Sequence, residues 1–320
     1  MSKFTLEFEK PLKELYDRIV QAKSLSNNSN VNNDELIISL ENQLLREQNN
    51  IYSNLTRWQK VQIARHPMRP HTSDYIRNIS NEWIEIHGDR KFSDDKAIIT
   101  GFGIIDNVKY AIIGQEKGRT TKEKLKHNFG MAKPEGYRKV QRLLLLAEKF
   151  NLPVITFMDT PGAFPGIGAE ERGQGEAIAK NLLEMSSLKV PIVSIVIGEG
   201  ASGGALGIGV CDRFLMMQNT WYSVISPEGC ASILFRDATK AEEAAEALKV
   251  IPNDLVKMGI CDKIIEEPNG GAHRDIESSS QNLKSAILNE LKKLEPVNPE
   301  SFIDLRIQKY DKLGVYEDLK

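Results

Sequence analysis

Two runs of apolar residues constrain the fold of this chain more than any other feature of its sequence. They cover residues 153–159 and 191–197, and in both the apolar side chains follow one another instead of alternating with polar ones. Strands of this kind have both faces covered, as in a parallel sheet that is flanked by helices. Helical patterns at 134–150 and 170–188 precede the two runs. The sequence therefore predicts an α/β fold.

The rest of the chain adds further elements. Residues 97–105 and 108–113 have the pattern of two strands. Asp106-Asn107 between them predicts a two-residue turn, because Asx residues tolerate the positive φ that such a turn needs. The remaining predicted elements are strands at 213–217 and 222–225 and helices at 82–86, 239–250 and 275–294.

The first 60 or so residues predict two polar helices, separated by an Asn- and Ser-rich break at 24–33. Both apolar faces are narrow, so we expect these helices to pack on each other or on another subunit. We divide the chain into an N-terminal helical segment (1–90), a core (91–295) and a C-terminal helical tail (296–320). The two narrow faces consist of Leu12, Leu15, Tyr16 and Ile19 in the first helix and Leu36, Leu40, Leu44 and Leu45 in the second.

The composition excludes several classes of protein. Hydrophobic residues make up 41% of the chain and charged residues 27%, which is ordinary for a globular protein and rules out a disordered or collagen-like chain. The 42 basic and 44 acidic residues give a net charge of −2, which favours neither nucleic acid nor an anionic membrane as a partner. Charges interrupt the apolar residues of the N-terminus, and no stretch of about 18 residues is free of polar groups. We therefore expect a cytoplasmic protein with no secretory signal and no membrane span.

Cysteine and histidine spacing predicts neither disulfides nor a metal site. Cys211, Cys230 and Cys261 form no Cys-x-x-Cys pair, which suits a reducing compartment. The five histidines show no His-x-x-x-His or His-x-x-Glu pairing. We expect this chain to bind no metal.

A glycine-rich segment follows the second apolar run. Six of the twelve residues from 198 to 209 are glycine, between a predicted strand and a predicted short helix. Without Cβ atoms the backbone can approach a ligand closely. N–H groups at the start of a helix can bind a phosphate or a developing oxyanion. This segment is the strongest candidate for a functional site.

The segment also matches two known patterns, each of which is weak by itself. Gly198-x-Gly200-x-x-Gly203 fits the dinucleotide fingerprint, but no acidic residue stands at 218–220, where that fold needs one to bind the ribose. Gly200-x-Ser202-x-Gly204 fits the nucleophile elbow of serine hydrolases. His273 is the only later histidine. A serine hydrolase that uses Ser202 and His273 therefore stays open as an alternative.

Two further segments are candidates for binding. Residues 159–168 form a turn-rich segment after the first apolar run, at the carboxyl end of a strand, where open parallel sheets bind ligands. The chain has no phosphate-binding Gly-x-x-x-x-Gly-Lys-Ser/Thr loop, so this segment predicts a pocket and not a GTPase switch. Residues 117–142 carry nine basic and two acidic residues, a local charge of +7. This stretch is either a solvated surface or a docking surface for an acidic or phosphorylated partner.

Several motifs stand in fixed order along the chain. They are Gly118-Arg119, Asn128-Phe129-Gly130-Met131-Ala132, Pro134-Glu135-Gly136-Tyr137-Arg138-Lys139, Asp159-Thr160-Pro161-Gly162-Ala163, Ala169-Glu170-Glu171-Arg172-Gly173-Gln174, Gly198-Glu199-Gly200-Ala201-Ser202-Gly203-Gly204-Ala205-Leu206 and Tyr222-Ser223-Val224-Ile225-Ser226-Pro227-Glu228-Gly229. With them the chain closely resembles the α subunits of bacterial acetyl-CoA carboxylase carboxyltransferases. The resemblance runs from residue 8 to residue 274, and it is loose in the N-terminal helices and at the end of the chain.

This resemblance implies a crotonase-like fold, which is a spiral of ββα units, behind an N-terminal helical extension. It implies a carboxyltransferase that joins a β subunit in an α2β2 assembly and transfers CO2 from carboxybiotin to acetyl-CoA. The product would be malonyl-CoA, in the first committed step of fatty acid biosynthesis. Biotin would be attached to the biotin carboxyl carrier protein and not to this chain, and zinc would be bound only by the β subunit. A separate biotin carboxylase would consume the ATP.

The resemblance also implies roles for particular residues. The backbone amides of Gly203 and Gly204 would form an oxyanion hole for the ureido oxygen of biotin, which gains negative charge when CO2 leaves. The charges of the reaction fall on carbonyl oxygens, so preorganised amides suffice without a strong side-chain base. The residues expected to line the biotin site are Gly162, Ala163, Phe164, Gly200, Ala201 and Ser202. The residues expected to dock the carrier or CoA are Arg119, Lys122, Lys126 and Arg138.

Two other interpretations concern the same glycines. A crotonase-type hydratase places a carboxylate shortly after its oxyanion glycines, and residues 205–209 contain none. Glu199 precedes the glycines, and we expect it to line the site without acting as a base. A non-catalytic scaffold, with all chemistry on the partner, stays open as a third interpretation.

Overall fold

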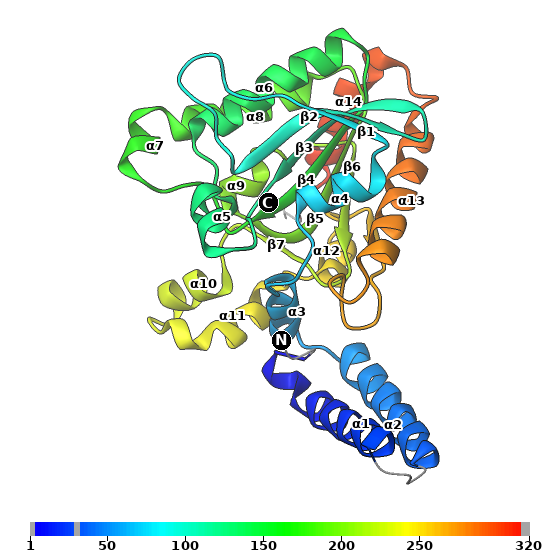
Figure 1. The fold of residues 1–320 in the computed structure, drawn as a ribbon. Helices are drawn as coiled ribbons and strands as arrows, with labels where there is room; N and C mark the ends of the chain where they lie inside the picture. Colours follow the sequence, from blue (N-terminus) through cyan, green and yellow to red (C-terminus); the bar gives the residue numbers. More distant parts are fainter. Residues whose placement is uncertain (1–3, 29–32, 315–320) are drawn as a thin grey trace, which may run out of the picture.

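The architecture is built on one mixed β-sheet with helices on both faces (Figure 1). It is seen in a computed structural model that describes residues 4–28 and 33–314. In this part of the chain the sheet has eight strands in the order β1-β2-β3-β4-β5-β6-β8, and β7 pairs with the end of β5. The first three strands are antiparallel neighbours, and the pairings from β3 onward are parallel. The strands are β1 (Glu82–Glu85), β2 (Ile98–Ile105), β3 (Val108–Gln115), β4 (Val154–Thr160), β5 (Ile192–Ala201), β6 (Arg213–Met217), β7 (Trp221–Ser223) and β8 (Lys263–Ile265).

The central strands are buried on both sides. Every residue of β4 and β5 is buried, as their continuous apolar sequences predict. On one face α6 (Pro134–Lys149) and α8 (Gln174–Ser187) contribute Tyr137, Leu144 and Met185 to the core. On the other face α4 (Thr72–Ile79) and α13 (Ile276–Leu294) pack on the sheet with their own apolar side chains. The predicted α/β fold is confirmed.

Residues 82–86 were predicted to be helical, and this prediction is wrong. Residues 82–85 form the edge strand β1, which pairs with β2. The ring of Trp83 lies across β2, where a Cβ at Gly101 would come within 2.7 Å of it. Gly101 and Gly103 of β2 therefore leave room for the ring of Trp83. The pairing of residues 82–85 with β2 outweighs their helix propensity, so the segment forms a strand.

Several element boundaries also differ from those predicted. The helix predicted at 170–188 is two helices, α7 (Ile167–Glu171) and α8, because Gly173 has a left-handed φ of +79° between them. The strand predicted at 191–197 continues to Ala201, and the strand predicted at 222–225 ends at Ser223. The turn at Asp106-Asn107 is confirmed, since both residues have positive φ, +47° and +64°.

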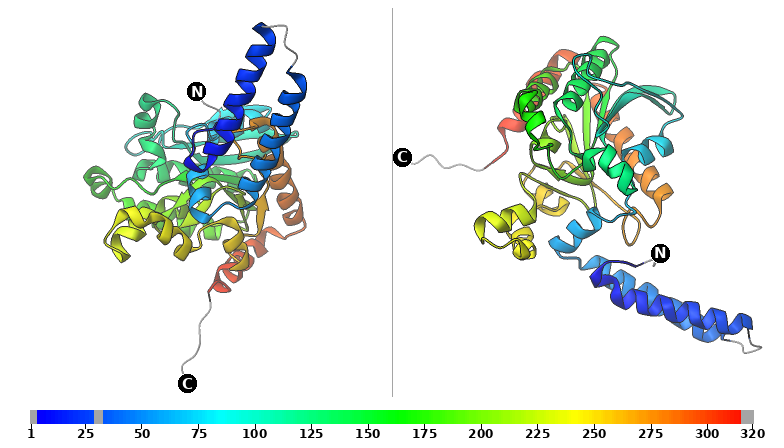
Figure 2. Two further views of the ribbon diagram at one scale, coloured as in Figure 1. Left: turned by 90° about the horizontal axis from the view of Figure 1, so that it is seen from below. Right: turned by 60° about the vertical axis from the view of Figure 1, so that its left-hand side comes forward.

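The N-terminal helices α1 (Lys10–Asn28) and α2 (Asp34–Ser53) form a hairpin that projects from the sheet domain (Figure 2). Leu15, Ile19 and Leu40 are buried between them, so the prediction that they pack on each other is confirmed. Residues 29–32 of the predicted break lie outside the described residues, as do residues 315–320 of the predicted tail. The C-terminal helix of the tail is α14 (Phe302–Asp311).

The remaining helices are short and lie mostly around the ends of the strands (Figure 1). Among the described residues no helix has both the length and the apolar character needed to cross a membrane. These helices are α3 (Arg57–Ala64), α5 (Thr121–Lys126), α9 (Ser202–Leu206), α10 (Pro227–Leu234), α11 (Ala241–Leu248) and α12 (Pro252–Lys257), with the 3₁₀ turns η1 (Glu7–Glu9), η2 (Asn128–Gly130), η3 (Ala238–Lys240) and η4 (Pro299–Ser301).

Candidate active site

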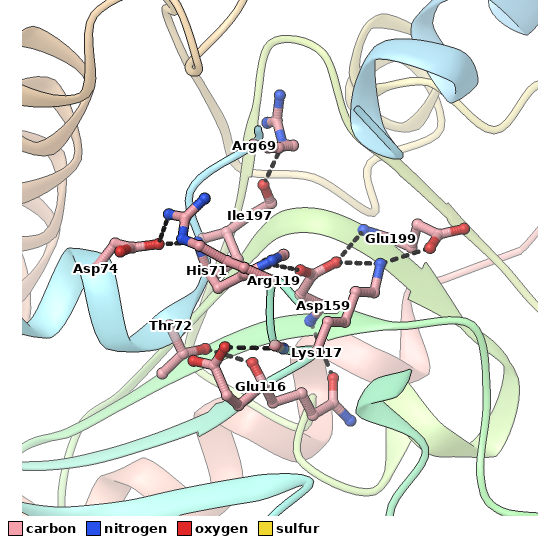
Figure 3. A network of polar contacts seen from close by, with 12 residues as sticks. Arg69, His71, Thr72, Asp74, Glu116, Lys117, Arg119, Asp159, Ile197 and Glu199 are labelled. Atoms are coloured by element: carbon pink, nitrogen blue, oxygen red, sulfur yellow. Dashed lines mark hydrogen bonds and ion pairs between the residues drawn. The ribbon is translucent and has the colours of Figure 1, made fainter. Parts of the chain in front are cut away.

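Three neighbouring strands bring polar residues together where they end. Gln115 is the last residue of β3, while Asp159 and Glu199 lie near the ends of β4 and β5. Lys117 follows β3 by two residues. Because β3, β4 and β5 are parallel neighbours, their carboxyl ends meet at one edge of the sheet. Figure 3 shows the network of polar contacts that results.

Lys117 is the centre of this network. Its Nζ lies 2.7 Å from Oδ1 of Asp159 and 2.5 Å from Oε2 of Glu199, and the two acidic residues are only 2% and 6% exposed. Burial by itself raises the pKa of Asp159, but Lys117 and His71 together outweigh this effect and hold that pKa well below its usual range. Burial likewise lowers the pKa of Lys117, and the attraction of the two carboxylates raises it by more. Lys117 and Asp159 are therefore both charged at neutral pH.

Further polar groups contact the carboxylates of Asp159 and Glu199. Nε of Arg65 lies 2.6 Å from Oε1 of Glu199, and the same guanidinium forms an ion pair with Glu228 of α10. Nδ1 of His71 lies 3.2 Å from Oδ2 of Asp159. The amide of Glu199 donates to Oδ1 of Asp159 at 3.0 Å. Charge-assisted hydrogen bonds therefore fix the ends of β4 and β5, from which the two candidate loops begin.

The glycine-rich segment changes from strand to helix at Ser202. Gly203 and Gly204 lie in the first turn of α9, where amide groups have no carbonyl partner inside the helix. Within the described part of the chain, neither amide donates to another group. Ser202 itself has a φ of +57°, which is uncommon for a residue with a side chain. The segment therefore presents two adjacent N–H donors at a sharp strand-to-helix junction.

The loop after β4 packs directly against these glycines. A Cβ at Gly204 would lie 2.4 Å from the carbonyl carbon of Gly162 and 2.6 Å from the nitrogen of Ala163. The hydroxyl of Thr160 fixes this loop, because it donates to the carbonyl of Gly162 at 2.7 Å and accepts from its amide at 3.1 Å. The structure thus brings together two segments that the sequence analysis selected separately.

The other predicted biotin-site residues have more varied surroundings. Ser202 is exposed, and Phe164 is partly buried in the loop that contains Gly162. Gly200 faces β7, where a Cβ would lie 2.6 Å from the ring of Tyr222. Ala201 is buried in an apolar cluster. Packing within the chain therefore accounts for Gly200 and Ala201, whereas Ser202 is exposed next to Gly203.

The structure does not support a Ser202–His273 pair. No hydrogen bond joins the two residues in the described chain, and the ring of His273 stacks on His66 with 3.8 Å between centroids. Neither ring nitrogen of His273 has a hydrogen-bond partner among the described residues. Burial lowers the pKa of His273 to about 2. A general base must be within hydrogen-bond reach of its nucleophile, so a serine hydrolase is not favoured.

Several charges of the basic stretch are paired with acidic residues of the chain. Arg119 pairs with Asp74 and remains exposed, while Arg138 pairs with Asp89 and is largely buried. Lys122 and Lys126 on α5 are exposed, and neither pairs with an acidic residue in the described ranges. Among the four residues predicted to dock a partner, these two lysines are the ones that are exposed and unpaired within the described chain, and the docking role of the set stays a prediction.

A cavity of about 210 Å³ lies over the ion network. Its walls include Arg65, Lys117, Phe129, Asp159 and Glu199, but neither Gly203 nor Gly204. Across residues 4–28 and 33–314, no group of three or more His, Cys, Asp or Glu side chains is placed to hold a metal ion. The cavity and the pair of amides are therefore separate features of the same strand ends.

Much of the network was not predicted from the sequence. Gln115, His71 and Arg65 were not among the candidate residues, and Lys117 was counted only as one charge of the basic stretch. One signal was available for Gln115, which ends an apolar strand as Asp159 does, at the edge where parallel sheets bind ligands. Arg65 and His71 come from the irregular segment before α4, and no local pattern there indicates their partners.

Comparison with known protein families gives one consistent match. The family model described as acetyl co-enzyme A carboxylase carboxyltransferase-like matches residues 5–314. The chain is 52% identical to the acetyl-coenzyme A carboxylase carboxyl transferase subunit alpha of Chlorobium luteolum, with 98% of each chain covered. It is 50% identical to the protein of the same name from Oceanobacillus iheyensis, with 97% of this chain and 98% of that one covered.

Solved structures with a similar fold include carboxylases and a transcarboxylase. Transcarboxylase 12S aligns with a TM-score of 0.53 at 19% identity over 68% of this chain and 42% of that chain. The β subunit of geranyl-CoA carboxylase from P. aeruginosa aligns with a TM-score of 0.53 at 15% identity over 82% of this chain and 48% of that chain. At these identities the likeness concerns the fold alone, and it confirms the expected crotonase-like architecture.

Proposed function

The chain belongs to the family of acetyl-CoA carboxylase carboxyltransferase α subunits and is a carboxyl transferase, and from that premise we propose how it works. We propose that it joins a β subunit in an α2β2 assembly and transfers CO2 from carboxybiotin to acetyl-CoA, giving malonyl-CoA for fatty acid synthesis. Biotin would arrive on a separate carrier protein that a biotin carboxylase has loaded. The β subunit would supply the acyl-CoA site and bind the zinc.

One observation carries the assignment of the site, namely the pair of first-turn amides at Gly203 and Gly204. Neither amide is used by another group of the described chain, and a Cβ at Gly203 would have 3.7 Å to its nearest neighbour, Cδ1 of Ile178. A ligand carbonyl can therefore approach the backbone here without meeting a side chain of residue 203. Two preorganised donors in such a place suit an oxygen that becomes negative during a reaction.

The residues present fit the ureido group of biotin. Bound carboxybiotin would supply the CO2, and its ureido oxygen would become more negative as the CO2 leaves. The amides of Gly203 and Gly204 would donate to that oxygen, and the backbone of Gly162 and Ala163 would hold α9 in place from behind. Ser202 and Phe164 would line the entrance. No side chain of this chain needs to act as a base, because the amides stabilise the charge.

The exposed lysines of α5 and the free cysteines bear on the partners and the location of the enzyme. Lys122 and Lys126 on α5 would attract acidic groups of the carrier domain or a CoA phosphate, since both lysines are exposed. Cys211, Cys230 and Cys261 are free thiols, and such thiols persist in reducing compartments. We therefore propose the cytoplasm as the location of the enzyme.

The test is co-expression of the chain with the zinc-binding β subunit, followed by an assay of malonyl-CoA-dependent carboxylation of free biotin. The wild-type complex should catalyse this transfer, whereas neither subunit alone should. Ser202→Ala should keep much of the activity, because only the backbone near Ser202 is used. A complex without transfer activity would contradict the proposal, and a complete loss of activity in Ser202→Ala would indicate a serine nucleophile instead.

A further inference from the structure

The buried side chain of Gln115 forms hydrogen bonds to both strand β4 and helix α9. It is the last residue of β3 and is fully buried. Its Oε1 accepts a hydrogen bond from the amide of Asp159 at 3.0 Å. Its Nε2 donates to the carbonyl of Gly204 at 2.7 Å. The carboxamide therefore joins the end of β4 to the first turn of α9.

A hydrogen bond to the carbonyl of Gly204 can fix the orientation of α9. This helix has only five residues, and isolated helices much shorter than about 12 residues do not hold their shape by themselves. Two adjacent glycines make its first turn more flexible still. The hydroxyl of Tyr137 reaches the same carbonyl at 3.4 Å, a longer contact than that of Gln115. Gln115 is thus the stronger of the two side-chain contacts to this turn.

Gln115 also has the correct chemistry for a fixed link. A carboxamide is a donor at one end and an acceptor at the other, so it satisfies an amide N–H and a carbonyl at the same time. Both of its partners are backbone groups, so the side chain holds the backbone of Gly204 at a fixed position relative to that of Asp159. The loss of either hydrogen bond would leave a buried polar group without a partner, which costs free energy. The arrangement therefore strongly favours a single geometry.

We propose that Gln115 is a positioning residue for carboxyl transfer, which holds the amides of Gly203 and Gly204 in register with the loop of Gly162 and Ala163. This inference rests on the proposed function, since it assigns Gln115 a role in that same reaction. The side chain does not touch the reacting atoms. It fixes the peptide that follows the two donors, and a donor that is misplaced by a fraction of an ångström loses much of its value in the transition state.

The first test is Gln115→Met in the complex with the β subunit. Methionine has a similar volume but makes neither hydrogen bond. We expect kcat for malonyl-CoA-dependent biotin carboxylation to fall about 10- to 100-fold. KM for malonyl-CoA should stay within about twofold, because an interaction that acts in the transition state affects kcat more than ground-state binding. The control is Gln141→Met, which removes a buried carboxamide that donates to the carbonyl of Ala177 in α8 at 3.4 Å.

The second test is the pH profile of Gln115→Glu. An ionised carboxylate cannot donate to the carbonyl of Gly204, whereas a protonated carboxyl group can donate there and still accept from the amide of Asp159. Burial raises the pKa of the introduced carboxyl group. We therefore expect the activity of Gln115→Glu, relative to wild type, to rise as the pH falls, and the ratio for Gln115→Met to stay level.

The outcomes separate the two proposals. A wild-type complex without transfer activity would overturn the proposed function and this inference with it. An active wild type with an equally active Gln115→Met variant would overturn the positioning role alone, as would an equal fall in kcat for Gln141→Met. If Gln115→Met does not assemble with the β subunit, the Gln115→Glu ratio decides, and a ratio that is independent of pH would contradict the role.

Discussion

Gly203 and Gly204 are adjacent and of the same type, yet the structure requires glycine only at one of them. A Cβ at Gly204 would lie 2.4 Å from the backbone of Gly162, closer than two carbon atoms can approach, so packing inside the chain excludes a side chain there. A Cβ at Gly203 would meet nothing closer than 3.7 Å. Glycine inside a helix costs about 1 kcal/mol relative to alanine. Packing therefore does not require glycine at position 203, and we propose that a ligand uses the space that this residue leaves open.

This difference predicts opposite effects of two alanine substitutions. Gly203→Ala should keep or raise the melting temperature of the complex, because alanine favours the helix, and should lower kcat by about 100-fold or more, because the methyl group blocks the approach to the amides. Gly204→Ala should lower the melting temperature, because the loop of Gly162 must move. Thermal unfolding and the transfer assay on both variants check this. Full activity in Gly203→Ala would indicate that the chain is only a scaffold.

At the scale of elements, α5 is the exposed remainder of the basic stretch. Its N-terminus is capped by Thr120, whose hydroxyl accepts from the amide of Glu123. Lys122, Leu125 and Lys126 are exposed on it. The neighbouring charges on Arg119, Arg138 and Lys117 are paired with acidic residues of the chain. The element, and not the whole stretch, is therefore the candidate docking surface.

The double variant Lys122→Glu with Lys126→Glu tests this surface. We expect the KM for the biotin carrier protein or for malonyl-CoA to rise roughly threefold to tenfold at low salt, with kcat little changed, because surface charges act mainly on encounter. The effect should shrink as salt is added. Lys292→Glu, on the exposed side of α13, serves as the control for charge reversal elsewhere. If both KM values stay at the wild-type level, the docking role of α5 is wrong.

At the scale of the whole molecule, buried polar groups attach the N-terminal segment to the core. Glu9 is fully buried and pairs with Arg274 at 2.6 Å. The hydroxyl of Thr5 lies 2.9 Å from Nε2 of His66, whose ring stacks on His273. The division of the chain at residues 90 and 295 stays a prediction. The α1–α2 hairpin projects from the sheet domain (Figure 2), whereas α4 and β1, which also precede residue 90, pack into it.

The stacked histidines predict that stability falls as the pH is lowered. Burial lowers the pKa of His66 to about 4 and that of His273 to about 2, from 6.5. Glu9 opposes the shift at His66, while Arg69 and Arg274 add to it at both rings. Between about pH 6.5 and pH 4 the unfolded chain therefore binds more protons than the folded one, so the free energy of unfolding decreases as the pH falls through this range.

The measurement is the melting temperature at pH 7.5 and at pH 5. Wild type should lose more on acidification than His273→Phe, because phenylalanine preserves an aromatic ring in the stack and cannot be protonated. His87→Phe provides the control, since the side chain of His87 is 62% exposed. An equal loss in wild type and His273→Phe would show that the stack does not set the acid sensitivity.

Local sequence predicted secondary structure best where the conformation depends on residues that are close in the sequence. The apolar runs predicted β4 and β5, and Asp106-Asn107 predicted the turn between β2 and β3, because burial and backbone conformation depend on neighbouring residues. The prediction failed at residues 82–86, where pairing with a distant strand decides the conformation. It also placed the end of β5 too early, because the pairing with β7 extends that strand through Ala201.

By itself the sequence determined that the chain is α/β, that its glycines follow a buried strand, and that its motifs are those of a carboxyltransferase α subunit. Only the tertiary structure decided that Gly162 packs on Gly204, that Gln115 joins Gly204 to Asp159, and that Lys117 pairs with Glu199 although 82 positions separate the two residues. Periodicity and missing Cβ atoms can be read from a few neighbouring residues. The partner of a buried charge or amide cannot, because it is chosen when strands distant in sequence end at the same edge of the sheet.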